Sequence, residues 1–495
     1  MMKQFAPDAA PPPPETLLEP DAIGVAQDTV IGMASSAPAG TVAALLAALA
    51  ATAAYSGGVA ILLTAIPMLI IANAYRRLNL WNANCGASFE WVGRAISPSL
   101  GFLTGWLMIG GYLFGTVAEV VVLAPSVLAV FGVEPHGPWA PIGIDTAVCV
   151  VMAVIVIVGI KLTARVQIAM AVIEYAILVG FSVAGLIAVL IRAPGTFRMS
   201  AGWWHLTGIG GAGSLAGALL AAIYAFSLWD GAIYVNEETR HRYVNPGRAA
   251  MWAVGLLTVL YALAQVGLQG VVSPRRLQAH SATAIIYAAQ ALGGPGWAKV
   301  MAAAVALSVI ATTGTGILLT SRIIYGMANR RVLPPALGNV SPRFRTPVLA
   351  SVVVAVLVIA IIWVYLLATG FTNVLGEVVA VAGLLAALFY ILTDLAMMVY
   401  YRRRIWASAR DFAEVGVLPL GAAVFLGWVV YRSVQGAPSA ERWTIAATIG
   451  IGLIFMLAAR FGLRSPFFAI PRESDPGASP VTATPGRPSD RIRQP

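Results

Sequence analysis

Charged residues are scarce in this chain. They make up 11% of its 495 residues, whereas hydrophobic residues make up 59%. A soluble domain of this size does not need so much apolar sequence. The mean hydropathy is +0.83, and nearly uncharged runs of about 18 or more residues recur along the whole chain. The sequence therefore predicts an all-α protein that crosses the membrane many times.

Several functional motifs are absent as well. The two cysteines, Cys85 and Cys149, are too few for a disulfide framework, and the four histidines are scattered, so we expect no metal site. There is no P-loop, Rossmann glycine pattern or nucleophile elbow. We therefore expect no enzymatic activity, no cofactor and no ATP-driven transport by this chain alone. The Pro-rich first twenty residues lack the layout of a signal peptide.

The net charge of +10 does not indicate nucleic-acid binding, because the basic residues gather between the apolar spans. Alternate connections carry them, and the lipid bilayer is the expected partner. By the positive-inside rule, both termini of a multi-pass protein of the inner (cytoplasmic) membrane would be cytoplasmic. The basic connections include residues 76–94, 161–165, 240–248, 330–345 and 402–404.

About twelve spans are predicted. They are residues 22–52, 55–75, 97–131, 142–160, 163–192, 207–236, 248–271, 296–326, 347–369, 375–401, 412–432 and 443–463. Two of them, the first and the sixth, are interrupted by Gly, Ser, Pro or Asp, within 29–40 and 221–232. Unwound backbone at membrane depth is tolerated only where protein buries it or where it lines a cavity. Paired interruptions of this kind indicate a transporter binding site.

Four stretches, in this order and spacing, resemble the amino acid–polyamine–organocation (APC) permease superfamily. They are Asn84–Arg94 continuing to Gly101–Trp106, Gly159–Gln167, Tyr234–Arg248, and Thr320–Asn329 with Arg345–Pro347. The resemblance implies a LeuT-type fold of two inverted five-helix repeats plus two C-terminal helices, and secondary transport of amino acids or related amines. The implied division is a disordered tail at 1–20, repeats at 21–192 and 193–405, two further helices at 406–471, and a disordered tail at 472–495.

The first break is the expected site of the substrate carboxylate. Unwinding frees backbone N–H groups at a half-helix N-terminus, which suits an anion. The predicted contacts are Gly32, Ala34, Ser35 and Ser36. Met33 interrupts a run of tiny residues found in the family, which either narrows the pocket or shifts the break. A kink that only eases packing is the alternative.

The second break is expected to receive the substrate ammonium on its freed carbonyls and to shape the side-chain pocket. The predicted binding residues there are Tyr224, Phe226, Ser227, Trp229 and Asp230. By resemblance, Tyr224 occupies the position of a gating aromatic. The family often has Gly where Leu228 stands. Plain packing is the alternative for each aromatic side chain.

Among the carboxylates within predicted spans, three are singled out: Glu119, Glu174 and Asp230. An ionised carboxylate at the bilayer centre costs about 2.5–3.5 kcal/mol, so such residues tend to be functional, paired or protonated. Glu174 falls where some proton-coupled relatives carry a lysine, and Asp230 aligns with an acidic position used in coupling, so both are proton-coupling candidates. Helix packing is the alternative for each. Glu119 has no motif and is expected to be structural, and Asp394 is expected to pair with an interfacial arginine.

Glu174 should face the interior of the bundle, because it shares a helix face with Gln167 and Ala171. On the eighth span Ser308, Thr312 and Thr315 also share one face. Their oxygens would suit sodium, and Ser308 with Thr312 is the possible sodium site. Hydrogen bonding within the helices is the alternative, and the more ordinary one.

We therefore expect a proton-coupled amino acid symporter that works by alternating access. An exchanger of amino acids or amines, or a sodium-coupled symporter, of the same fold is the nearest alternative. A membrane amino acid sensor with a transporter fold is an alternative from another class.

Overall fold

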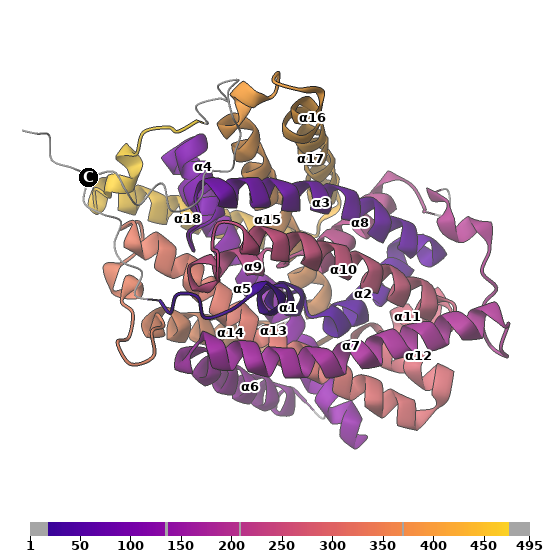
Figure 1. The fold of residues 1–495 in the computed structure, drawn as a ribbon. Helices are drawn as coiled ribbons and strands as arrows, with labels where there is room; N and C mark the ends of the chain where they lie inside the picture. Colours follow the sequence, from indigo (N-terminus) through magenta and orange to yellow (C-terminus); the bar gives the residue numbers. More distant parts are fainter. Residues whose placement is uncertain (1–17, 134–136, 207–208, 369–370, 475–495) are drawn as a thin grey trace, which may run out of the picture.

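The computed structural model describes residues 18–474, with gaps at 134–136, 207–208 and 369–370 (Figure 1). Over these residues the chain is helical, and twelve helical segments are long and apolar enough to cross a membrane. This confirms the predicted all-α fold with about twelve spans. The two predicted tails lie almost wholly outside the described residues.

The first five spans start from two half-helices. They comprise α1 (Val25–Ser35) with α2 (Pro38–Thr52), α3 (Gly57–Trp81), α5 (Pro98–Phe131), α6 (Trp139–Val158) and α7 (Ile160–Leu190). The next five start in the same way. They comprise α8 (Ala212–Phe226) with α9 (Gly231–Tyr234), α10 (Asn245–Gln269), α13 (Pro295–Asn329), α14 (Val348–Ala368) and α15 (Phe371–Tyr400). The last two spans contain α17 (Leu418–Gly436) and α18 (Ser439–Leu457).

Helices in equivalent positions of the two halves contact each other. α3 packs on α10, α5 on α13 and α6 on α14. Such pairing is expected when two five-helix units are related by a two-fold axis in the membrane plane. The residue boundaries of the two repeats stay a prediction.

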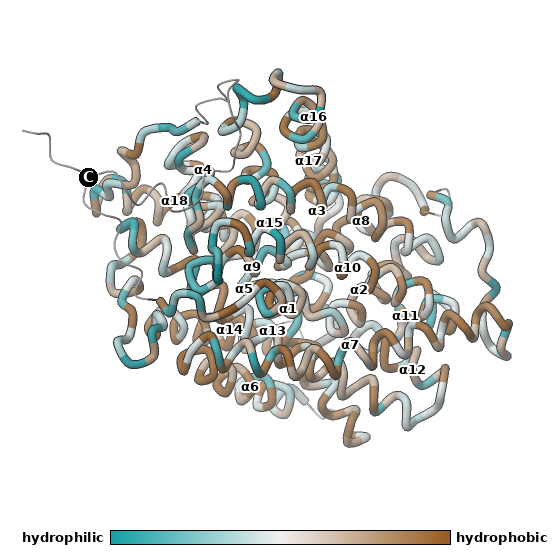
Figure 2. The backbone as a smooth tube through the Cα atoms, in the orientation of Figure 1, coloured by the Kyte–Doolittle hydropathy of each residue, from teal (hydrophilic) through white to brown (hydrophobic). Residues whose placement is uncertain are grey.

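The broken first span lies in the interior of the bundle. In Figure 1, α1 and α9 appear near the centre, between α3 on one side and α7 on the other. Buried residues make up 94% of the most apolar stretch of the first span but only 11% of that of the twelfth. Figure 2 shows long helices that are largely hydrophobic, with hydrophilic residues gathered mainly at the connections. Polar residues inside the first span therefore face protein rather than lipid.

Three short helices were not predicted. α4 (Ser88–Ala95) precedes α5, while α11 (Pro274–Ala279) and α12 (Ala284–Gly293) lie between the seventh and eighth spans and pack on α2. α12 is apolar but too short to span a membrane. Gln278 anchors α11, because its side-chain amide donates to the Ala50 carbonyl at 2.9 Å.

We call the end of the bundle formed by residues 18–24, 82–97, 235–244 and 330–347 the basic end. Backbone bonds tie the segment before α1 to the segment after α9 here: Ala22 N donates to Glu238 O at 2.8 Å, and Arg240 N to Ile23 O at 2.9 Å. Arg322 donates two bonds to the Glu238 carboxylate, at 3.0 and 3.1 Å, and both side chains are fully buried. These bonds therefore hold the segments before α1 and after α9 together at the basic end.

The expected pairing of Asp394 with an arginine is wrong. The side chain is fully buried in α15, and neither carboxylate oxygen has a hydrogen-bond partner among the described residues. Its position on the inward face of the helix, rather than at the membrane edge, explains the error.

Candidate substrate and coupling site

The first break falls at Ser36 and Ala37, at the late end of the predicted stretch. α1 remains helical through Ser35, so of the four predicted carboxylate contacts Gly32, Ala34 and Ser35 lie in the last turns of α1 and Ser36 lies in the break. Ala37 adopts a left-handed conformation, with φ of +38°. Pro38 then opens α2, where its missing N–H costs nothing.

The second break comprises Ser227 to Asp230, between α8 and α9. Tyr224 and Phe226 remain in the last turn of α8. Leu228 has a φ of +71°, in the left-handed region that favours glycine. That conformation accounts for the glycine that the family often has at this position.

The two breaks touch each other. The Ser36 hydroxyl donates to the Ser227 carbonyl oxygen at 2.8 Å. Gly32 approaches the second break so closely that an added Cβ would lie 2.9 Å from the Trp229 carbonyl oxygen. The glycine is therefore required for helix approach, and the irregular backbone of both breaks forms one site.

A carboxylate from another helix holds the N-terminus of α2. Ala39 N donates to Glu174 Oε1 at 2.8 Å, and Gly40 N donates to Ser308 Oγ at 3.3 Å. Ser308 in turn donates to Glu174 Oε1 at 2.7 Å. The α7 carboxylate thus links the first break to α13.

The predicted inward face of α7 is confirmed, because Gln167, Ala171 and Glu174 are all buried. Both amide atoms of Gln167 lack a hydrogen-bond partner among the described residues. Buried polar groups of this kind are usually satisfied by water. Gln167 and Glu174 therefore form a polar strip within the bundle.

Glu119 on α5 also faces the first break, although its sequence context suggested a structural role. Tyr224 donates to its Oε1 at 2.6 Å, and the Thr41 hydroxyl lies 2.8 Å from the same oxygen. Its Oε2 is buried without a partner among the described residues, and a Cβ on Gly40 would lie 2.5 Å from it. The signal in the sequence that could have identified Glu119 as a site residue was its position as a lone carboxylate in the middle of a long apolar span.

Asp230 is enclosed by three tyrosines from three helices. Tyr112 of α5 and Tyr390 of α15 donate to its Oδ1 at 2.9 and 3.0 Å, and Tyr234 of α9 donates to Oδ2. The carboxylate is fully buried. Its three hydrogen bonds therefore tie the second break to α5 and α15.

The aromatic side chains of the second break point in two directions. Trp229 stacks on Tyr390 at 5.7 Å and meets the edge of Tyr75 at 5.2 Å, and its indole N–H has no partner among the described residues. Phe226 instead packs edge-on against Tyr261 at 5.5 Å. Tyr261 donates to the carbonyl of Ser36 at 3.2 Å, which places Phe226 beside the first break.

The hydroxyls on α13 are engaged with protein atoms. Thr312 donates to the Ala34 carbonyl at 2.6 Å, Ser308 donates to Glu174, and Thr315 bonds within its own helix. In the part of the chain that the structure describes, no group of three or more His, Cys, Asp or Glu residues is arranged to hold a metal ion.

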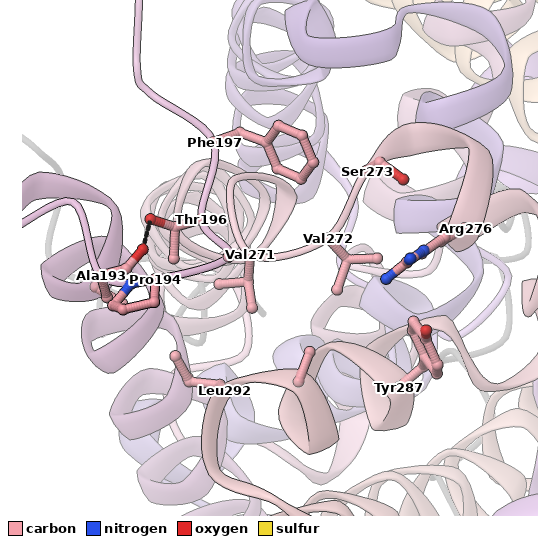
Figure 3. A pocket seen from close by; sticks show the side chains of 13 residues that line it. Ala193, Pro194, Thr196, Phe197, Val271, Val272, Ser273, Arg276, Tyr287 and Leu292 are labelled. Carbon is pink, nitrogen blue, oxygen red and sulfur yellow. Dashed lines mark hydrogen bonds between the residues drawn. The ribbon is translucent and has the colours of Figure 1, made fainter.

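The site is closed to solvent. Ser36 and Ser227 are 3% exposed, and Trp229 and Asp230 are fully buried. A separate cavity of about 440 Å³ lies at the other end of the bundle, between the end of α7 and α12 (Figure 3). Arg276 and Tyr287 line it together with apolar side chains, and none of the predicted site residues does.

Comparison with known proteins gives one family. Residues 27–472 match the model described as amino acid permease. The human large neutral amino acids transporter small subunit 2 is 30% identical over 176 residues, 34% of this chain and 32% of that protein. The match thus spans about a third of the human protein. An uncharacterized transporter of Mycobacterium tuberculosis is 27% identical over 348 residues, 68% of this chain and 73% of that protein.

The fold also matches a solved structure. A mutant of the Eremococcus coleocola manganese transporter superposes with a TM-score of 0.59 at 13% identity, covering 88% of this chain and 94% of that chain. At this identity the likeness concerns the fold alone. With the twelve spans and paired breaks, it confirms the predicted LeuT-type architecture. Because the family model covers most of its length, the chain belongs to the amino acid permease family.

Proposed function

We propose that this protein is a proton-coupled symporter of amino acids that works by alternating access. The observation that carries the proposal is the buried Glu174 carboxylate, which accepts hydrogen bonds from the first break and from Ser308 of α13. A group with this placement can couple a proton to the geometry of the site, because its charge determines how strongly it holds α2.

The substrate would lie between the two breaks, with its carboxylate toward the first and its ammonium toward the second. The proposed binding residues are Gly32, Ala34, Ser35, Ser36, Tyr224, Phe226, Ser227, Trp229 and Asp230. The unpartnered indole N–H of Trp229 supports this placement, because a buried donor without an acceptor is costly until a ligand or water satisfies it. Asp230 is the second candidate for proton coupling.

We favour a proton over sodium because Ser308, the first residue of the possible sodium site, is hydrogen-bonded to the Glu174 carboxylate, which can itself take up a proton. We place the protein in the cytoplasmic membrane with both termini in the cytoplasm, because Arg240, Arg330 and Arg345 lie at the basic end.

The test is uptake of radiolabelled amino acids into proteoliposomes, with and without an acid-outside pH gradient. The wild type should accumulate substrate only with the gradient. Glu174→Gln mimics the protonated side chain, so it should keep counterflow exchange but lose gradient-driven accumulation. Asp145→Asn, which alters another fully buried carboxylate, on α6, should behave as the wild type.

Other outcomes identify the alternatives. A sodium requirement with Glu174→Gln unaffected would assign coupling to Ser308 and Thr312. Exchange without net accumulation in the wild type would indicate an antiporter, and binding without any transport would indicate a sensor.

A further inference from the structure

The first turn of α2 offers few hydrogen-bond donors, and all of them are taken. Pro38 has no N–H, Ala39 N donates to Glu174, and Gly40 N donates to Ser308. The next N–H, that of Thr41, already makes the first intrahelical bond, to Ala37 O at 2.7 Å. A helix N-terminus attracts anions through such donors. In this structure it already holds one, which the protein itself supplies.

A second observation indicates that this turn receives a ligand. Glu119 Oε2 is fully buried, has no partner among the described residues and faces Gly40. A buried carboxylate oxygen without a donor is costly. Glu119 also accepts from Tyr224 at the end of α8, just before the second break. The ammonium of an α-amino acid whose carboxylate bound at α2 would therefore point toward the second break and supply that donor.

We infer that the first turn of α2 is a single carboxylate site for which Glu174 and the substrate compete, and that Glu174 must take a proton before the substrate carboxylate can bind there. This inference rests on the proposed function only in taking an amino acid as the substrate.

Electrostatics excludes shared occupation. The N-terminus of a helix carries about half a positive charge, enough to favour one carboxylate but not two. Ser308 of α13 donates to Glu174, and the titratable groups close enough to interact with its charge are Glu119 of α5, Tyr261 of α10 and the adjoining Tyr175; within the described residues none of these is a cation. Two ionised carboxylates at α2 would therefore repel each other, because the substrate's single ammonium is paired with Glu119.

The exchange balances one proton against one substrate. A proton from solvent binds the Glu174 carboxylate and makes it a neutral acid. The Ala39 N–H then donates its hydrogen bond to the substrate carboxylate instead of to Glu174. The complex carries one more proton than the free protein whenever Glu174 is ionised beforehand. Linkage then requires the apparent affinity for the substrate to fall about tenfold for each pH unit above the pH at which Glu174 titrates.

The experiment is calorimetric binding of the transported amino acid to purified protein, without any gradient. Titrations at several pH values, each in two buffers of different ionisation enthalpy, give the number of protons taken up. The wild type should go from none at low pH to about one per substrate at high pH. Glu174→Gln should take up none, and its affinity should not change with pH. Asp145→Asn should match the wild type.

Two results would overturn the inference: proton uptake that persists in Glu174→Gln, or wild-type affinity that is constant while uptake remains zero across the pH range. Ser308→Ala is the second variant, in case the first does not fold. It removes a donor to the ionised Glu174, so the fall in affinity should begin at a higher pH, and an unchanged curve would contradict the competition.

A ligand without the carboxylate separates competition from a general effect of pH. The methyl ester of the substrate should lose most of its affinity, and any remaining binding should not take up a proton. Equal proton uptake with the ester would refute the shared site while leaving proton coupling intact. Proton-linked binding without gradient-driven uptake would instead refute the proposed function and leave the shared site standing.

Discussion

The two breaks carry carboxylates that are held in different ways. At the first break, Glu174 and Glu119 lie near α2, and one oxygen of Glu119 has no partner among the described residues. At the second, Asp230 accepts three bonds from phenols and is fully buried. The carboxylates at the first break can therefore exchange hydrogen-bond partners, whereas Asp230 has little capacity to accept a further hydrogen bond.

This difference indicates that the two breaks, although similar in local structure, have separate roles. A carboxylate that holds a backbone N–H can yield it to another anion, as the competition at α2 requires. A carboxylate that ties three helices together resists change, because freeing one partner leaves buried polar groups unpaired. We therefore expect binding of the substrate carboxylate and proton uptake at the first break, whereas at the second we expect Asp230 to fix the positions of the helices that surround the rest of the substrate.

The largest effect is expected where the two breaks meet. Gly32→Leu should abolish substrate binding, because even a Cβ would lie 2.9 Å from the Trp229 carbonyl and would force the breaks apart. Membrane insertion should persist, which expression and size-exclusion profiles would show. Gly180→Leu is the matched control, since nothing lies within 4 Å of a Cβ at that exposed position of α7. Binding retained by Gly32→Leu would refute a joint site.

Asp230→Asn should reduce stability more than it alters proton coupling. It replaces one acceptor oxygen by an NH2 group, so at least one of the three phenols loses its acceptor, and a buried donor left unsatisfied costs about 1–3 kcal/mol. The melting temperature in detergent should fall, while proton uptake on substrate binding should stay close to that of the wild type. Loss of proton uptake at an unchanged melting temperature would transfer the coupling role from Glu174 to Asp230.

Trp229→Ala should change the rank order of substrates. The indole lies at the junction of the two breaks with an unpartnered N–H, and a lost apolar contact is worth about 1–3 kcal/mol between competing substrates. Competition by a panel of unlabelled amino acids measures the order. An unchanged order with lower expression would make Trp229 a packing residue against Tyr75 and Tyr390.

The spans could be predicted because their signal is local. A long apolar run needs no partner to be recognised, and the first span was expected at 22–52 and observed at 25–52. The inward face of Glu174 followed from helical spacing in the same way. The break was located less well, because Ser36, Ala37 and Pro38 terminate α1 about one turn after Gly32.

The roles of single carboxylates could not be predicted, because they depend on contacts between distant segments. Glu119 is hydrogen-bonded to Tyr224, 105 residues away in the sequence, and Glu174 is hydrogen-bonded to Ala39, 135 residues away. Asp394 was assigned an arginine from its nearness to a basic stretch in sequence, but its helix turns it inward. Nothing in the local pattern indicated that the α2 N-terminus is already occupied.

The smallest expected effect concerns Glu237, just beyond the second break. Cys85 N donates to its carboxylate at 3.0 Å, and burial raises the pKa of Glu237 above its usual value. A carboxyl group with a raised folded-state pKa contributes stability below its unfolded pKa, and this contribution is lost as pH rises through the folded value. The wild type should thus lose more thermal stability than Glu237→Gln as pH rises from about 4 towards neutrality. Melting curves of both proteins, without substrate, measure the difference. Parallel curves would remove Glu237 as a source of pH dependence and leave the pH response of binding to Glu174 at the first break.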